Sequence, residues 1–345
     1  MFKKLVIATS LLLLLLIGSF IYPQPAAKIE NTQQTSSLRI KVARYYWPGE
    51  HWIEIADKKG WFKEAGLNVE LVDTNSDYYG SLQDMVDGKI DVNNFTLFDI
   101  MHFNASGADL VLAINSDNSF GIEAIVASQS IATIKELKGK TIGVDRGSYL
   151  EYILDIVLKR HGLVPGDVNK VQLTAENAVA EFGKGELDAI ITWEPFASEA
   201  MQVRHGHKLF DTSEIPGISP NGQVFHRSFI EQRPEDVQAY VSVWYKTIQF
   251  IQDKPKQAYA IIADIYNTTE EEVEAYQQLE LLLDLRDNTT SFSYGTGFES
   301  LHGAARYINN FLIDNGTISR PMDSTEFIDP TFIRTLKHRL QQEAL

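Results

Sequence analysis

The sequence contains no cysteine among its 345 residues. A chain without cysteine forms no disulfide, has no thiol nucleophile and lacks the residue that carries a bacterial lipoprotein anchor. Basic residues are also scarce, with 31 Lys and Arg against 46 Asp and Glu and a formal net charge of −15. An acidic balance of this kind opposes binding to nucleic acid and to anionic membranes. The charge balance is that of a soluble, exported protein.

Common catalytic and nucleotide-binding motifs are absent as well. The chain has no Gly-x-Ser-x-Gly, no Walker loop and no Gly-x-Gly-x-x-Gly. His205 and His207 form a short pair without a third metal ligand at a recognisable spacing. No two carboxylates are placed by the sequence for acid–base chemistry. We therefore expect no metal, no cofactor and no enzymatic activity.

The amino terminus has the pattern of a targeting segment. Lys3 and Lys4 precede an apolar run over residues 5–22, which includes six consecutive leucines at 11–16. The small-residue cleavage pattern after this run is poor, and the run is near the minimum length of a spanning helix. We predict a cleaved signal peptide over residues 1–27, with an uncleaved anchor as the alternative, and a polar linker over 28–37. The remainder is then exported, and the periplasm is the expected location.

One pattern occurs twice along the chain. Residues 88–92 read Gly-Lys-Ile-Asp-Val, and residues 185–189 read Gly-Glu-Leu-Asp-Ala. Upstream of each copy lies the same order of strand, loop, amphipathic helix, Gly-Leu and strand. We interpret Asp91 and Asp188 as structural turn residues before their strands. Two α/β lobes of one design imply a cleft between them, with a ligand in that cleft.

The repeat predicts how the chain divides. We place lobe 1 at residues 38–127 and 221–345, and lobe 2 at residues 128–220. From about Ser228 the chain is predicted to be helical, beginning with a helix after Pro234 whose apolar residues share one face. A tail of helices this long is expected to pack back onto lobe 1.

Two loops precede helices at equivalent places in the two lobes. Tyr45, Trp47 and Gly49 belong to the first loop, and Gly147 and Ser148 to the second. The first N–H groups of a helix lack partners and bind anionic or dipolar groups. In open α/β sheets ligands also lie beyond the carboxyl ends of strands, where both loops are expected. An ordinary strand-to-helix turn is the other interpretation of Gly147 and Ser148.

Aromatic and acidic residues gather near the same strand ends. Trp47 and Trp193 are the aromatic residues that we assign to the ligand, because both sit where a strand ends. Glu194 follows the strand that ends at Trp193, and Asp117 is another candidate carboxylate. A carboxylate inside a cleft needs a hydrogen-bonding or cationic partner, which a ligand amine supplies.

At this point the chain resembles a known family, the solute-binding proteins of ABC importers for nitrate, sulfonate and taurine. These proteins are in turn similar to thiamine-pyrimidine proteins of bacteria and fungi. The resemblance is carried by residues 55–70, 88–92, 137–144, 185–189 and 193–195. It implies an α/β type II periplasmic-binding fold of two lobes that close over a small ligand, with the helical carboxyl-terminal part on lobe 1.

The resemblance also implies which residues touch the ligand. They are residues of the 45–50 loop, the turn with Tyr79 and Gly80, the strand end at Thr96, the helix start at Gly147 and Ser148, and the loop with Trp193 and Glu194. Residues 115–121, around Asp117, depart from the Asp-x-Ser-x-Gly region of many members.

The predicted function is an exported substrate-binding protein that delivers a small organic solute to the membrane subunits of an ABC importer, acts as a monomer and binds no nucleic acid. Only Arg44 and Arg146 are placed to bind an anion. A ligand with an amine or a flat ring is therefore favoured, such as an aminosulfonate or a pyrimidine. Two alternatives stay open, a membrane-anchored extracytoplasmic sensor and an enzyme related to thiamine-pyrimidine synthesis.

Overall fold

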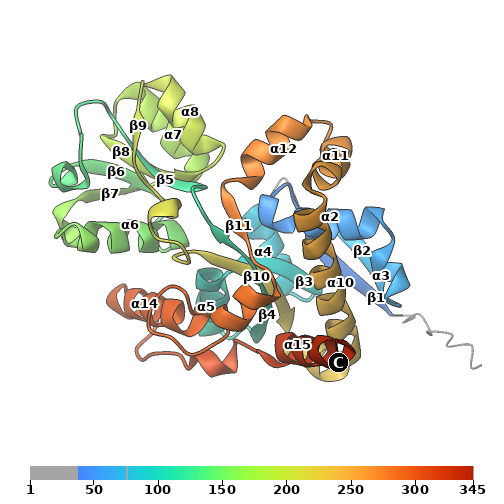
Figure 1. Cartoon of the computed structure of the whole chain (residues 1–345). Helices are drawn as coiled ribbons and strands as arrows, with labels where there is room; N and C mark the ends of the chain where they lie inside the picture. The colour runs from blue at the N-terminus through green and yellow to red at the C-terminus, as the bar shows by residue number, and fades with distance from the viewer. Residues whose placement is uncertain (1–37, 75–76, 345) are drawn as a thin grey trace, which may run out of the picture. The chain divides into compact units, whose positions relative to one another are not determined.

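The computed structural model describes residues 38–74 and 77–344 and places their strands in two separate sheets (Figure 1). The first sheet contains β1 (Arg39–Arg44), β2 (Asn68–Asp73), β3 (Val92–Thr96), β4 (Leu110–Ser119), β10 (Pro220–His226) and β11 (Glu280–Leu282). The second contains β5 (Glu123–Ala127), β6 (Thr141–Val144), β7 (Asn169–Gln172), β8 (Ala189–Trp193) and β9 (His207–Asp211). The predicted signal or anchor segment and its linker lie outside the described residues.

Helices surround each sheet (Figure 1). Before β10 they are α2 (His51–Lys58), α3 (Trp61–Glu64), α4 (Tyr78–Val86), α5 (Leu97–Ala105), α6 (Tyr149–Arg160), α7 (Ala175–Lys184) and α8 (Phe196–Val203). After β10 they are α9 (Arg227–Gln232), α10 (Pro234–Asp253), α11 (Pro255–Tyr266), α12 (Glu270–Gln277), α13 (Leu285–Ser291), α14 (Leu301–Asp314) and α15 (Thr331–Glu343). Short 3-10 turns are η1 (Pro48–Glu50), η2 (Ile134–Leu137), η3 (Pro165–Asp167), η4 (Thr212–Glu214) and η5 (Ser324–Glu326). Within the described part of the chain, no helix combines the length and apolar character needed to cross a membrane.

The first sheet brings several strand ends to one edge. Its order is β11-β4-β10-β3-β1-β2, with β1 parallel to β2 and β3. β10 is antiparallel to β3, so that Asn221 near its start lies opposite Thr96 at the end of β3. Every residue of β3 is buried, as expected of a strand covered on both faces. The loop after β1, the end of β3 and the start of β10 therefore meet at one edge.

The second sheet has the order β7-β6-β8-β5-β9. β6 is parallel to β7 and β8, whereas β5 is antiparallel to β8 and β9. Glu123 at the start of β5 lies opposite Trp193 at the end of β8. The chain passes from the first sheet to the second between Ser119 and Glu123, so β5 pairs in the second sheet. The division predicted from the sequence had placed residues 123–127 with the first part.

The repeated sequence pattern has a structural counterpart in its two aspartates. Asp91 accepts a hydrogen bond from the Lys41 N–H at 2.7 Å, and Asp188 accepts one from the Thr141 N–H at 2.9 Å. Lys41 lies in β1 and Thr141 begins β6. Each aspartate therefore joins the turn before one strand, β3 or β8, to the parallel neighbouring strand, β1 or β6, which confirms their interpretation as structural residues.

The carboxyl-terminal helices pack mainly around the first sheet. The predicted apolar face of α10 is buried as its periodicity indicates, with Val237, Val241, Trp244, Ile248 and Ile251 in the core. The ring of Tyr240 on this helix stacks on Phe62 at 5.6 Å and meets Trp52 at 5.3 Å.

The carboxyl-terminal part was predicted to be helical and to pack on lobe 1, and two of its features differ from that prediction. β11 pairs with β4, with Leu281 opposite Asn118, because the outer edge of β4 is otherwise open to another strand. Phe311 of α14 contacts both Phe98 of α5, at 5.7 Å, and Tyr152 of α6, at 5.9 Å. The tail therefore also touches the helix that covers the second sheet.

Candidate ligand-binding pocket

A cavity of about 300 Å³ lies where the strand ends of both sheets meet. Its size is at the lower end of the range for small-molecule sites. The lining residues are Tyr45, Tyr46, Trp47, Thr74, Tyr78, Asn94, Thr96, Glu123, Tyr149, Trp193, Glu194, Pro195, Phe196, Asn221 and Tyr276. Hollows of about 410 and 490 Å³ lie elsewhere, beside α10 and α13 and between α6 and α14. The cavity at the strand ends is the candidate site, because α/β folds bind their ligands there.

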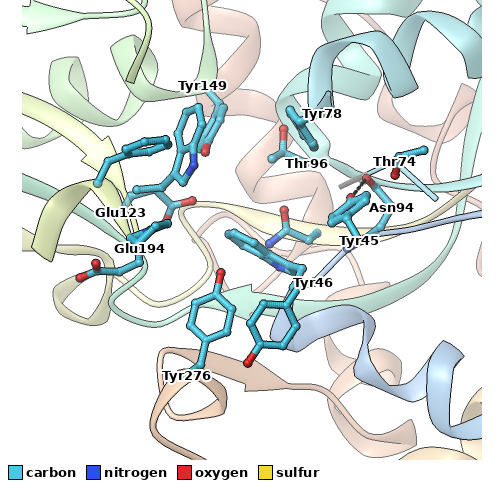
Figure 2. A pocket seen from close by; sticks show the side chains of 15 residues that line it. Tyr45, Tyr46, Thr74, Tyr78, Asn94, Thr96, Glu123, Tyr149, Glu194 and Tyr276 are labelled. Atoms are coloured by element: carbon cyan, nitrogen blue, oxygen red, sulfur yellow. Dashed lines mark hydrogen bonds between the residues drawn. The ribbon is translucent and has the colours of Figure 1, made fainter. Parts of the chain in front are cut away.

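Aromatic side chains from the first sheet and the tail form one wall. Tyr46 and Tyr276 lie side by side with ring centroids 5.3 Å apart (Figure 2), and Trp47 meets Tyr276 edge-on at 6.5 Å. The hydroxyl of Tyr45 donates to the Asn94 carbonyl at 2.7 Å, which fixes its ring edge-on to Tyr78 at 6.0 Å. This side of the pocket is therefore an ordered aromatic surface.

A second aromatic wall comes from elements around the second sheet. The rings of Tyr149 and Trp193 stack with centroids 6.2 Å apart, and Phe196 meets Trp193 edge-on at 6.0 Å. Tyr149 is the first residue of α6, and Phe196 is the first residue of α8. Figure 2 shows Tyr149 and Glu123 across the cavity from Tyr46 and Tyr276. Flat or cationic groups bind well between such walls.

Glu123 is the carboxylate best placed to meet a ligand. Its side chain is only 1% exposed; Oε1 accepts from the Ser119 hydroxyl at 3.2 Å, and Oε2 has no hydrogen-bond partner. Burial raises the pKa of its carboxyl to about 7, although the hydroxyls of Ser119 and Thr212 oppose that rise. The Ser119 and Thr212 hydroxyls are the nearby donors of this buried carboxylate and neither carries a positive charge, so a cationic donor from a ligand would stabilise it further.

Glu194 also lines the pocket, but its carboxylate already has partners. Oε2 accepts from the Ser198 N–H at 3.0 Å, and Oε1 lies 3.9 Å from the Lys208 ammonium. The sequence assigned Glu194 to the polar end of the ligand and did not single out Glu123. Glu123 begins β5, directly opposite Trp193, a pairing that only the sheet topology reveals.

Asp117 and Gly49 lie together without lining the cavity. Asp117 is fully buried, and Asn221 donates to its Oδ2 at 2.9 Å. A Cβ at Gly49 would come within 2.1 Å of the Asp117 carboxylate, so glycine is required there. Burial raises the pKa of Asp117 to about 6. The pKa of Glu280 is raised well above its ordinary value by burial and by the nearby charge of Asp117. These two carboxyls form a buried acidic group close to Glu123.

In the second predicted loop, backbone N–H groups are already hydrogen-bonded to side chains of the protein. The Gly147 N–H donates to Glu151 Oε2 at 2.7 Å, and the Arg146 N–H donates to Gln172 at 2.7 Å. Ser148 caps α6 by accepting from the Leu150 N–H at 3.1 Å. Gly147 and Ser148 are therefore not among the lining residues; Tyr149, the next residue, lines the cavity instead.

Tyr79 and Gly80 also lie outside the cavity lining. The Gly80 N–H donates to Asp77 at 2.8 Å, as part of the cap of α4. Tyr79 is 40% exposed, and its hydroxyl donates to Asp145 Oδ2 at 3.0 Å. This hydrogen bond joins α4, beside the first sheet, to the loop after β6 in the second.

The pocket brings together five of the predicted residues, which are Tyr45, Trp47, Thr96, Trp193 and Glu194. Gly49, Tyr79, Gly80, Asp117, Gly147 and Ser148 lie beside or behind it. Among the other lining residues, Tyr46 and Pro195 lie in loops that the resemblance had implied, whereas Thr74, Tyr78, Asn94, Glu123, Tyr149, Phe196, Asn221 and Tyr276 were not predicted. Several of these residues adjoin predicted residues in the sequence. Asn221 and Tyr276 do not, because they belong to β10 and to α12 of the carboxyl-terminal part. Within residues 38–74 and 77–344, no group of three or more His, Asp or Glu could hold a metal ion.

Comparison with known proteins gives a consistent result. The family described as “NMT1/THI5 like” matches residues 51–258. A putative aliphatic sulfonates-binding protein of Bacillus subtilis is 26% identical over 309 residues, which is 88% of each chain.

Solved structures of similar fold include the periplasmic aliphatic sulphonate binding protein SsuA of Escherichia coli. It has a TM-score of 0.68 and 17% identity, covering 84% of this chain and 92% of that one. The desulfurization enzyme DSZB is also similar, with a TM-score of 0.59 and 16% identity, covering 87% of this chain and 99% of that one. These likenesses confirm the predicted two-lobe α/β fold of the periplasmic binding proteins.

Proposed function

This chain belongs to the NMT1/THI5-like family, and on that premise we propose that it is an exported solute-binding protein of an ABC importer. It captures a small organic solute in the pocket between its two sheets and passes it to the membrane subunits. The observation that carries this proposal is the pocket itself, to which Trp47 of one half and Trp193 of the other both contribute. A ligand held between two halves stabilises the arrangement in which both contact it.

The connections between the halves support a closing motion. The chain crosses between the sheets at residues 120–122 and again at 212–219. The two crossings are joined, because the Gly121 N–H donates to Thr212 Oγ1 at 2.9 Å and the Ser119 N–H donates to the Ser219 carbonyl at 3.2 Å. Gly121 has a φ of 126°, a conformation that favours glycine. Two short, linked crossings suit a hinge between lobes.

The chemistry of the pocket supports binding without catalysis. Its lining offers no His, Lys or Arg to act as a base toward a hydroxyl nucleophile, and the chain has no cysteine. The two lining carboxylates are a buried Glu123 and a hydrogen-bonded Glu194. We propose that the protein carries its solute and leaves it chemically unchanged, because the similar proteins include several that are named for binding.

A double-label experiment tests the closing motion. Because the chain lacks cysteine, Lys63→Cys on α3 and Glu186→Cys before β8 place two dyes selectively on exposed positions of the two halves. Addition of the solute recovered from cell-derived protein should change energy transfer between the dyes in a saturable manner. Saturable binding without any change in transfer in this or a second labelled pair would contradict closure.

Fractionation and native mass spectrometry test export and carriage. We expect the mature protein in the osmotic-shock fluid as a monomer that retains one small molecule. Recovery only with the membrane fraction would support the anchored sensor instead. Conversion of the retained molecule into a product on incubation would show that the protein is an enzyme.

A further inference from the structure

We propose, on the basis of the proposed function, that the solute is an organic cation whose positive nitrogen lies against Glu123 between the two aromatic walls. Such a ligand differs in charge from the sulfonates for which the similar proteins are named. Four features of the described residues lead to this class of ligand: the lack of a cationic partner for Glu123, the composition of the lining, the pairing of nearby basic residues, and the occupation of one backbone donor at each of three helix starts.

Glu123 lacks a partner of opposite charge. Its Oε2 has no hydrogen-bond partner, and its neighbours include two further buried carboxyls, Asp117 and Glu280. The Ser119 hydroxyl lies within hydrogen-bond distance of both Glu123, at 3.2 Å, and Glu280, at 3.4 Å. A buried acidic group of this kind gains most from a ligand that brings a positive charge and an N–H or polarised C–H donor.

The lining of the pocket has the composition of an aromatic cage. Eight of its residues are aromatic, and none is Lys, Arg or His. Indole and phenol rings attract a cation through their faces, with the largest effect where water is excluded. An anion in the same cavity would meet two glutamates and no positive side chain.

Two basic residues near the pocket, Arg44 and Lys208, are paired with carboxylates of the protein. Arg44, at the end of β1, binds Glu54 at 3.1 Å and Asp73 at 3.4 Å. Lys208 on β9 lies 3.5 Å from Asp211 and 3.9 Å from Glu194. Neither basic residue lines the cavity.

One backbone donor at the start of each of three helices near the pocket, α4, α5 and α6, is also taken by a side chain of the protein. A helix amino terminus binds an anion through its free N–H groups. Here the protein's own side chains take these donors: Asp77 accepts from the Gly80 N–H, Thr96 from the Asp99 N–H, and Glu151 from the Gly147 N–H. Each of these bonds is 3.0 Å or shorter. These three N–H groups are therefore not free to bind a sulfonate or carboxylate.

A matched set of probes tests the sign of the charge. We would measure binding by calorimetry at pH 8 with choline, benzyltrimethylammonium and benzylamine as cations. Their neutral counterparts are 3,3-dimethylbutan-1-ol, neopentylbenzene and benzyl alcohol, and the anions are ethanesulfonate and benzenesulfonate. At least one cation should bind ten or more times more tightly than its neutral counterpart and than either sulfonate. Failure of every cation, or equal or tighter binding of a sulfonate, would overturn the inference.

Two isosteric variants locate the charge effect. Glu123→Gln should weaken the best cation at least tenfold and change the affinity for its neutral counterpart less than threefold. Glu280→Gln removes a buried carboxyl that does not line the cavity and should change cation affinity much less. Thermal melts confirm folding, and Glu123→Gln should melt no lower than the parent because it removes an unpaired buried carboxyl. Equal losses in the two variants would show that Glu123 is not the counter-charge.

The solute retained by cell-derived protein separates this inference from the function on which it rests. A retained cation supports both. A retained anion overturns the charge inference and leaves the carrier function intact. Absence of any retained or imported solute, together with unchanged growth and uptake when the gene is deleted, would overturn the carrier function itself.

Discussion

The two halves of the pocket use the same local design in opposite ways. In the first half, the loop between β1 and α2 turns Tyr45, Tyr46 and Trp47 toward the cavity. In the second half, the equivalent loop between β6 and α6 is closed by Glu151 and Gln172, which accept its backbone N–H groups. The shared topology therefore places two loops near the pocket. Whether a loop can contact a ligand depends on the side chains in it and around it.

The halves also differ in what they contribute to binding. The first half gives most of the aromatic surface, while the second gives Glu123 and the stacked pair Tyr149 and Trp193. In the proposed binding mode, the second half supplies the charge of Glu123, whereas both halves supply aromatic surface. A ligand meets this charge and both aromatic walls only when it contacts the two halves together, which makes closure dependent on the ligand.

The largest contrast is expected between the glycines of the two loops. Gly49→Ala places a Cβ within 2.1 Å of the buried Asp117 carboxylate, so we expect about 3 kcal/mol of destabilisation from overpacking. Gly147→Ala meets no atom within 4 Å and is strained only by its φ of 81°, so about 1 kcal/mol is expected. Chemical denaturation measures both. Equal losses would mean that the first loop has room to relax around Asp117.

A pH titration tests the charge in the second half. Because the Glu123 pKa is raised to about 7, the carboxylate form required by a cation is lost as the pH falls below that value. Cation affinity should be constant above about pH 8 and fall about tenfold per unit between pH 7 and 5. The groups around Glu123 are Ser119 and Asp117 on β4, Glu280 on β11, Thr212 on η4, Tyr149 on α6 and Tyr276 on α12. Calorimetry with a permanently charged probe gives the profile.

The stability of the ligand-free protein should change in the opposite sense. A carboxyl with a raised folded-state pKa stabilises the fold fully below its unfolded pKa, and this contribution is lost as the pH rises through about 7. Glu123→Gln should remove the pH dependence near pH 7 from both the cation affinity and the stability of the ligand-free protein. Persistence of the full affinity profile in this variant would assign the titration to Asp117, whose pKa is about 6.

The aromatic walls of the two halves can be compared by single truncations. Trp47→Ala and Trp193→Ala should each weaken the solute by about 1–3 kcal/mol, the range for a desolvated aromatic contact with a cation. Trp47→Phe should recover part of the loss because it restores an aromatic face. Thermal melts of the ligand-free variants are the control, since both side chains are only partly buried. Unchanged affinity in one truncation would assign binding to the opposite wall.

The smallest effect is expected at the closed loop of the second half. Ser148→Ala removes the cap of α6 and should cost about 1 kcal/mol of stability. It should leave solute affinity nearly unchanged, because Ser148 does not line the cavity. Ser148→Asp, which retains a cap, is the matched control. A tenfold loss of affinity at constant stability would show that this loop does meet the solute.

Much of the fold follows from patterns within short stretches of the sequence. The apolar periodicity of α6 and α10 and the repeated Gly-x-x-Asp turns indicated two α/β lobes and a helical tail. β11 was missed, because a strand of three residues, Glu280–Leu282, depends on the open edge of β4 and has little signal of its own.

The site was predicted less completely for a related reason. Trp47 and Trp193 were found because they follow or end strands, and strand ends share an edge in a parallel sheet, whereas Thr96 was implied by the family resemblance. Glu123 starts an antiparallel strand, and Tyr276 comes from the tail, so their places depend on pairing across the whole chain. Gly147 and Ser148 had a suitable motif, but Glu151, one turn further along α6, occupies the Gly147 N–H.

The hydrogen bond between Tyr79 and Asp145 has a consequence for the time that a solute stays bound. It joins the two halves at a partly exposed position outside the cavity, so solute chemistry does not determine its strength. In the proposed closing motion, this bond must break before the two halves separate and release the solute. We therefore expect it to lengthen residence, so that a contact on the protein's own surface contributes to the release step.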